Sequence, residues 1–218
     1  MGTINPMKGL MAYYYYSSRG IFLFVFALCL GAAAIFLITG QTQAHFFVGM
    51  FAISIPAYVI MVSMGYEGAK WERFQITMPV RRKELADSQY IRILLASIVG
   101  IPFFVIVTGI GYVLHENLFE NPFMSTVVVS TSLLLSHPLI LAGLIFPLTF
   151  LVKEGGRQDA AIVICVFASI AIWVFLGSVG LDLGLSEETA ALLTLSISAA
   201  ICIVSNLIVR RMYAKGDF

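Results

Sequence analysis

The chain has 218 residues, of which 60% are hydrophobic and only 11% carry a charge. Soluble domains carry about 25% charged residues, so this composition excludes a soluble globular protein and indicates a membrane protein. The formal net charge of +1 points to no class of partner by itself, and a single transmembrane domain over residues 1–218 is the simplest architecture.

The segment before the first apolar run, residues 7–18, reads MKGLMAYYYYSS. Leu10, Met11 and Tyr14 share one helical face, and tyrosines suit the headgroup zone of a bilayer. We predict a short interfacial helix lying on the membrane surface. The alternative is that these residues form the start of the first span.

Six apolar runs are long enough to cross a bilayer, which takes about 20 helical residues. Each must be helical, because lipid offers no hydrogen-bond partner to an exposed backbone. The first run is too long for the apolar region of a signal peptide and lacks a convincing cleavage site, so it is interpreted as a retained span. The predicted fold is an all-α membrane protein with six transmembrane helices, near residues 20–39, 46–65, 93–114, 124–151, 160–180 and 189–209.

Prolines interrupt three of these spans. Pro56 lies in the second, Pro102 in the third, and Pro138 and Pro147 in the fourth. The fourth run covers about 28 residues, or ~42 Å, which exceeds a hydrocarbon core of ~30 Å. This span is therefore predicted to kink or to continue past the membrane.

The basic residues sort by loop. All 13 Lys and Arg residues lie in the N-terminal segment, the loop between spans two and three, the loop between spans four and five, or the C-terminal tail. The alternate loops carry acidic residues and no basic ones. The positive-inside rule therefore predicts that both termini are cytoplasmic. The complete partition also supports six spans, because one missed or extra span would break it.

Few side chains inside the spans could carry chemistry. His137, beside Pro138, is the one histidine expected at depth, and we favour a packed side chain donating to a nearby carbonyl over a functional group. His45 and His115 are predicted to be solvated at the outer membrane edge. The three cysteines lie in apolar runs without metal-ligand spacing and are predicted to pack rather than to react: Cys29, Cys165 and Cys202.

Several functional motifs are absent from the sequence. It contains no P-loop, no metalloprotease motif and no G-x-S-x-G motif. No Asp, Glu, Lys or Arg is predicted well inside a span, although ion-coupled transporters place such groups near the midplane. The pattern therefore disfavours secondary transport and a membrane enzyme that needs an acid–base pair.

One charged stretch, residues 66–92, lies between the second and third spans and holds six of the 13 basic residues. Pro79 divides it, and a helix beginning near residue 81 is predicted to lead into the third span. Aromatic side chains ringed by charges are typical of protein interfaces. In a helix over residues 66–78, four residues share one face: Glu67, Trp71, Phe74 and Met78.

The alternative is a surface helix whose basic residues bind anionic lipid while its aromatic residues enter the interface. Glu67, Glu72, Glu84 and Asp87 would be repelled by such lipid. The mixed charges therefore favour docking to another protein.

These residues resemble the first cytoplasmic loop of type-2 ABC exporter permeases, six-span proteins that pair with separate ATPase subunits. The resemblance rests on Glu67, on residues 71–74 (WERF) and on residues 77–85 (TMPVRRKEL), where Pro79 and Arg82 match the family pattern. The six-span layout, the surface helix and the basic cytoplasmic loops match across the whole chain. A methionine stands at position 78, where the family usually has leucine.

The resemblance implies that this stretch is a cytoplasmic coupling helix, through which ATP binding and hydrolysis in the partner switch the spans between access states. It implies a homo- or heterodimer of permeases with two copies of an ABC ATPase, which would bind ATP and Mg. The chain itself would hold no cofactor, no metal and no catalytic residue. The implied ATPase-docking residues are Glu67, Lys70, Trp71, Phe74, Met78, Pro79 and Arg82.

The resemblance also bears on the substrate. In length and loop pattern the chain looks most like bacterial exporters of phenol-soluble modulins, which implies export of hydrophobic or amphipathic molecules, including peptides, across the bacterial plasma membrane. No nucleic-acid partner is implied. The loop over residues 177–186 is short, which leaves little room for the re-entrant outer helices of some relatives.

Two other classes of function are alternatives. A non-transporting membrane scaffold or immunity protein would bind a peptide or partner in the bilayer without an ATPase, and an adjacent gene encoding a P-loop would count against it. A lipid enzyme would need clustered Asp, Glu or His at a membrane face. Small residues at Thr194, Ser198 and Cys202, or at residues 31–34, could permit close helix packing within one bundle or between two copies.

Overall fold

The part of the chain described by this computed structural model, residues 6–57, 82–115, 122–152 and 155–215, contains helices and no strand. Five helices include a segment long and apolar enough to cross a membrane: α1, α5, α6, α7 and α8. The sequence predicted these five spans at nearly the same positions. The elements are α1 (Pro6–Thr39), α2 (Thr42–Gly49), η1 (a π-helical segment, Met50–Ser54), α5 (Arg82–Leu114), α6 (Phe123–Leu151), α7 (Gly155–Asp182) and α8 (Glu187–Lys215).

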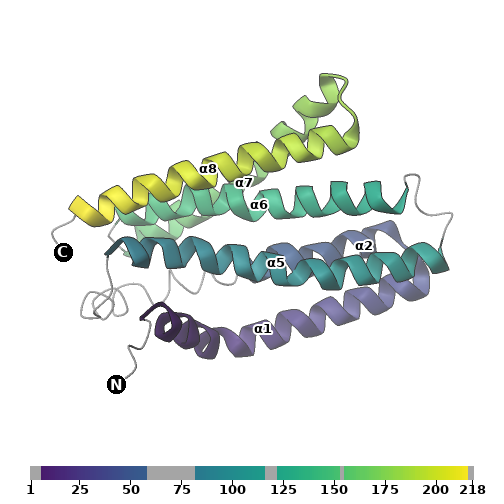
Figure 1. The fold of residues 1–218 in the computed structure, drawn as a ribbon, viewed down its shortest axis with the longest axis horizontal. Coiled ribbons are helices and arrows are strands. Elements are labelled where there is room, and N and C mark those ends of the chain that lie inside the picture. The colour runs from purple at the N-terminus through teal and green to yellow at the C-terminus, as the bar shows by residue number, and fades with distance from the viewer. Residues whose placement is uncertain (1–5, 58–81, 116–121, 153–154, 216–218) are drawn as a thin grey trace.

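The long helices lie side by side along one bundle (Figure 1). The first turns of α1 and the last turns of α8 lie at the same end of it. The end of α1 and the start of α5 lie at opposite ends, so the chain crosses the bundle between them. α2 and η1 form the first part of that crossing, up to Ala57. The rest of the predicted second span, residues 58–65, lies outside the described residues, and the count of six spans stays a prediction.

α1 is one helix from Pro6 to Thr39. Residues 7–18 are thus helical, as predicted, and they are continuous with the first span. Figure 1 shows the first, purple turns of α1 at an angle to the rest of the helix. Their placement on a membrane surface stays a prediction.

The helix widens after α2 into η1, where the amide of Ile55 donates to the carbonyl of Met50, five residues earlier. Pro56 has no N–H and cannot bond to the carbonyl of Ala52, as residue 56 of an α-helix would. A β-carbon added to Gly100 of α5 would lie 1.8 Å from that Ala52 oxygen. Glycine therefore allows α5 and η1 to meet backbone to backbone.

α6 is the central helix, because more than half of its spanning segment is buried, against less than a third in the other four. The core forms two clusters along it. One joins α6 to the start of α5 and the end of α8, and it includes Tyr90 and Phe146. The other joins α1, η1 and the second half of α5 around Phe36, Ile53 and Phe104. Lipid is as apolar as these side chains, so close packing is what holds the helices together.

α6 stays helical throughout although Pro138 and Pro147 lie inside it. Its 29 residues extend over ~43 Å, compared with a hydrocarbon core of ~30 Å. α6 is one unbroken helix, and its extension past the membrane stays a prediction.

α7 and α8 are joined by a tight turn. The amide of Leu185 donates to the carbonyl of Gly180 at 3.3 Å, and Gly184 has a φ of 71°. This is the Schellman arrangement that ends many helices, and its left-handed position favours glycine. The connection between these helices is as short as the sequence predicted.

Candidate functional site at the junction of α5 and α8

Most residues predicted to dock an ATPase lie outside the described residues: Glu67, Lys70, Trp71, Phe74, Met78 and Pro79. Arg82 is the first residue of α5. The helix predicted to begin near residue 81 and to lead into the third span is present as α5, which runs without a break to Leu114. The described structure therefore shows what the predicted docking segment leads into.

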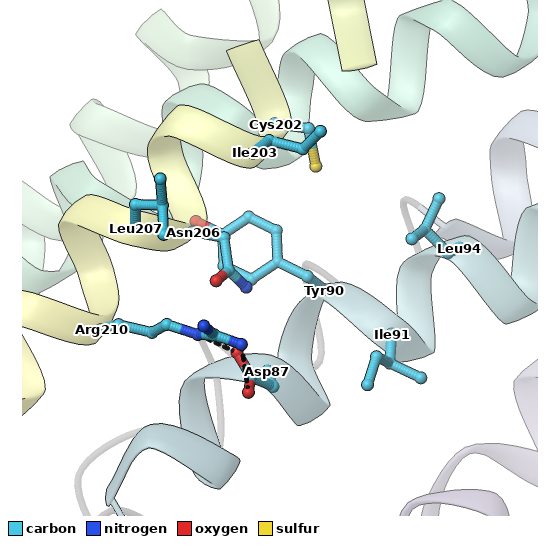
Figure 2. Close-up of a pocket in the computed structure, with 9 residues that line it drawn as sticks. All are labelled: Asp87, Tyr90, Ile91, Leu94, Cys202, Ile203, Asn206, Leu207 and Arg210. Atoms are coloured by element: carbon cyan, nitrogen blue, oxygen red, sulfur yellow. Dashed lines mark hydrogen bonds and ion pairs between the residues drawn. The ribbon is translucent and has the colours of Figure 1, made fainter. Parts of the chain in front are cut away.

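An ion pair joins α5 and α8 at the end of the bundle where α5 begins and α8 ends. The Nε and Nη2 atoms of Arg210 donate to Oδ1 and Oδ2 of Asp87 at 2.5 and 2.6 Å. This bidentate geometry fixes the guanidinium and the carboxylate relative to one another. The side chains of Arg210 and Asp87 are 40% and 22% exposed, so solvent weakens their attraction. Figure 2 shows the two side chains pointing toward one another from the two helices.

Two hydrogen bonds extend this contact. The Tyr90 hydroxyl shares a buried hydrogen bond of 2.7 Å with Ser205 Oγ, and the Gln89 side-chain amide donates to the Tyr213 hydroxyl at 3.3 Å. The three contacts are spread over two turns of α8, so they oppose both sliding and rotation of one helix against the other. We call these six residues the α5–α8 junction: Asp87, Gln89, Tyr90, Ser205, Arg210 and Tyr213.

The sequence placed Arg92 in the charged loop, but Arg92 is buried inside α5. Its Nε donates to the carbonyl of Ser88, one turn earlier, at 3.3 Å. The helix that leads from residue 81 into the third span was predicted, but the burial of Arg92 within it was not. Arg92 therefore belongs to the helix that the junction holds.

A groove of about 350 Å³ runs between α5 and α8 beside the ion pair. Asp87, Asn206 and Arg210 line one end of it, while Leu94 and Ile203 line the other (Figure 2). Its volume falls in the range of roughly 300–1,000 Å³ that is usual for small-ligand sites. The groove is apolar along most of its length and polar at one end.

Comparison with known families decides the class of this chain. A family model described as ABC-2 family transporter protein matches residues 13–214, almost the whole sequence. The chain belongs to the ABC-2 transporter family. No curated protein and no solved structure gives a significant match.

The ABC-2 protein is accordingly a multi-pass membrane permease of an ABC transporter, and its family implies an ABC ATPase as partner. Permeases of this family are typically non-catalytic membrane subunits. The resemblance to type-2 ABC permeases is thereby confirmed. The narrower likeness to exporters of phenol-soluble modulins stays a prediction.

His137 of the ABC-2 permease is buried beside α7. Its Nε2 lies 3.4 Å from Ser169 Oγ, and the Ser169 hydroxyl donates to the Val166 carbonyl, so the imidazole is the donor. His137 is packed, as the sequence predicted, and its donation to a nearby carbonyl stays a prediction. The Trp173 indole donates to the carbonyl of Leu133 at 2.9 Å. These contacts hold α7 against α6.

The prediction that His45 is solvated was wrong, because His45 is buried. Its Nε2 lies 2.9 Å from Thr108 Oγ1, and the Thr108 hydroxyl donates to the Phe104 carbonyl. The imidazole therefore donates to the hydroxyl, since the single hydroxyl proton is already used. His115 is half-buried, with Nε2 3.0 Å from the Leu37 carbonyl oxygen. Both histidines link α5 to earlier segments.

The small residues considered for a dimer contact behave differently in the two spans. Thr194, Ser198 and Cys202 are buried within this one chain, so their face of α8 packs inside the bundle. In α1, Gly31 and Ala34 face outward, and no atom of the described residues lies within 4 Å of a β-carbon placed on Gly31.

The described residues form no cluster of three His, Cys, Asp or Glu side chains that could hold a metal ion. The three cysteines are unpaired and buried, as the apolar runs predicted. The groups that stand out in the described part are therefore the polar residues of the α5–α8 junction.

Proposed function

We propose that this permease is the membrane subunit of an ATP-driven exporter and that it docks its ATPase through a coupling helix before α5. The exported molecules would be hydrophobic or amphipathic, including peptides. Two permease copies, identical or different, would assemble with two ATPases, which supply the ATP and Mg sites. The proposed docking residues are Glu67, Lys70, Trp71, Phe74, Met78, Pro79 and Arg82.

The observation that carries the proposal, beyond family membership, is the position of α5. This helix starts within a few residues of Pro79 and continues for 33 residues, so a displacement at its first turn is carried along the bundle. The α5–α8 junction lies one to two turns from that start. A movement of the docked ATPase would thus reach α8 as well as α5.

The distribution of charged residues and the directions of the helices support a cytoplasmic position, in a bacterial cell membrane, for the end of the bundle where α5 begins and α8 ends. Arg82, Arg210 and Arg211 lie where α5 begins and α8 ends. The turn between α7 and α8, at the other end, carries Asp182, Glu187 and Glu188. By the positive-inside rule the basic end is cytoplasmic, together with both termini.

The test removes the aromatic and acidic anchors of the proposed coupling helix. We expect Trp71→Ala or Glu67→Ala to weaken ATPase binding roughly 30-fold or more, as loss of about 2 kcal/mol at an interface anchor would. The measurement is co-purification with the ATPase, followed by ATP hydrolysis with and without cargo.

Ile76→Ala is the matched control, because Ile76 lies opposite the face that Glu67, Trp71, Phe74 and Met78 share in the predicted helix. It should leave both co-purification and hydrolysis near those of the wild type. Normal ATPase binding and normal coupled hydrolysis in both anchor variants would overturn the proposed docking site. Transport of cargo by the permease alone would overturn the exporter proposal itself.

A further inference from the structure

We propose that the groove between α5 and α8 is a binding site for one phospholipid whose headgroup carries a phosphate and a primary ammonium. The phosphate would contact Arg210, the ammonium would contact Asp87, and one acyl chain would lie along Ile91, Leu94 and Ile203. The inference concerns a ligand of the bundle and goes beyond the proposed transport function.

Helix lengths place the polar end of the groove at headgroup depth. Counting ~20 residues of hydrocarbon core from Leu114 toward the start of α5 reaches residue 95, and ~20 residues from Thr189, after the exposed glutamates of α8, reaches residue 208. Asp87 then lies ~12 Å beyond the core boundary and Arg210 ~3 Å beyond it. The apolar end of the groove, at Leu94 and Ile203, falls at the edge of the hydrocarbon. The groove therefore has the same order of polar and apolar layers as a lipid.

Among the described residues, the ion pair has unused hydrogen-bonding capacity on both partners. Arg210 has five N–H donors and directs Nε and Nη2 at Asp87. A carboxylate has about four acceptor positions, so Asp87 keeps room for a second donor. Asn206, at the same end of the groove, adds an amide.

Charge selects the headgroup class. An anionic headgroup without an amine would meet Arg210 but would be repelled by Asp87. A quaternary ammonium has no N–H that could donate to the acceptor positions of Asp87 that Arg210 leaves open. A headgroup with a phosphate and a primary ammonium satisfies both side chains, and charge-assisted hydrogen bonds of this kind are the strong ones.

The groove opens at the surface of the bundle. Ile203 and Leu207, on its α8 side, are 61% and 50% exposed. An acyl chain can therefore enter sideways from the bilayer without crossing water. Ordinary lipid contact with the bundle surface would show no headgroup preference, and this difference makes the proposal testable.

The experiment uses the full-length permease in nanodiscs that contain equal amounts of three lipids with the same acyl chains: phosphatidylethanolamine, phosphatidylcholine and phosphatidylglycerol. Native mass spectrometry counts the lipids retained after mild activation. We expect one phosphatidylethanolamine per chain, retained roughly tenfold or more over either other lipid, as loss of a hydrogen bond to a charged group predicts.

Two groove-filling variants with neighbouring controls test the location. Ile203→Trp should abolish the preference, whereas Val204→Trp, at an adjacent site that is 55% exposed and outside the groove, should keep it. Leu207→Trp and Ile208→Trp form a second pair on the same helix, so the test survives misfolding of one variant.

Equal retention of the three lipids, a preference for phosphatidylglycerol or phosphatidylcholine, or a preference that survives both groove-filling variants would overturn the proposal. Loss of the preference in both control variants would overturn it too. If the groove-filling variants kept the lipid but lost cargo-stimulated hydrolysis, the groove would belong to the substrate path instead. The lipid measurement needs no ATPase, so its failure would leave the proposed function standing.

Discussion

The Ser54 hydroxyl donates a hydrogen bond of 2.9 Å to the carbonyl oxygen of Leu134, across the contact between η1 and α6. That carbonyl is the one that residue 138 of an unbroken helix would use, and Pro138 has no N–H to offer it. A serine of η1 therefore satisfies a backbone group that the proline leaves open in α6.

Ser54→Ala should lower the free energy of unfolding by about 1–2 kcal/mol, because it leaves a buried carbonyl without this donor. Ser196→Ala is the matched control, since Ser196 is exposed and bonds only to the Leu192 carbonyl of its own helix. Unfolding in mixed micelles of increasing SDS content measures both. Equal effects of the two variants would mean that the hydrogen bond across η1 and α6 adds no stability.

Gly100→Ala should be among the most disruptive small substitutions in this chain. The new methyl group would lie 1.8 Å from the Ala52 carbonyl oxygen. Because that oxygen belongs to the backbone, no side-chain rotation can relieve the clash, and we expect the free energy of unfolding to fall by about 3 kcal/mol or more. Gly31→Ala, on an open face of α1, should instead be neutral or stabilising by about 0.5–1 kcal/mol. Size-exclusion profiles and unfolding midpoints would compare the two, and a monodisperse, stable Gly100→Ala protein would contradict the backbone contact.

The Asp87–Arg210 pair should behave as one unit in a double-mutant cycle. Because Arg210 is partly exposed, we expect a coupling free energy of about 0.5–1 kcal/mol between Asp87→Asn and Arg210→Gln. The exchanged variant, Asp87→Arg with Arg210→Asp, should recover part of that loss. Unfolding free energies of the four proteins of the cycle provide the measurement, and purely additive effects would argue against the pair.

The three cysteines should resist alkylation in the folded protein. Cys29, Cys165 and Cys202 are buried, so N-ethylmaleimide should add nothing in nanodiscs and three groups after denaturation in SDS, as read by intact mass. Glu188→Cys, at an exposed position at the start of α8, provides a reactive control. Rapid modification of any native cysteine would place it at an accessible surface and contradict the packing.

The long helices could be predicted from hydropathy because lipid permits little else. The fourth span was predicted over residues 124–151 and α6 covers Phe123–Leu151. The ends of the helices were less predictable. The apolar run of the third span begins at residue 93, so Arg92 was expected at its edge and not at a buried position within α5.

The contacts within the site could not be predicted from one sequence. Asp87 and Arg210 are 123 positions apart, and each looks like an ordinary solvated charge beside a span. Their pairing depends on which helices become neighbours, and hydropathy does not encode that. The burial of His45 could not be predicted for the same reason, because its partner Thr108 lies in another helix. Pro56 signalled a break in the second span, but no sequence pattern indicated a π-helical segment or its contact with Gly100.

The Schellman turn between α7 and α8 limits how this permease can open. α8 is anchored to α5 by the junction at one end, and at the other end the turn at Gly184 leaves only residues 183–186 between it and α7. A displacement of α5 would therefore reach α8 through the junction, while the turn keeps the other end of α8 beside α7. A gap between the ends of α7 and α8 on that side could form only if this turn were first broken.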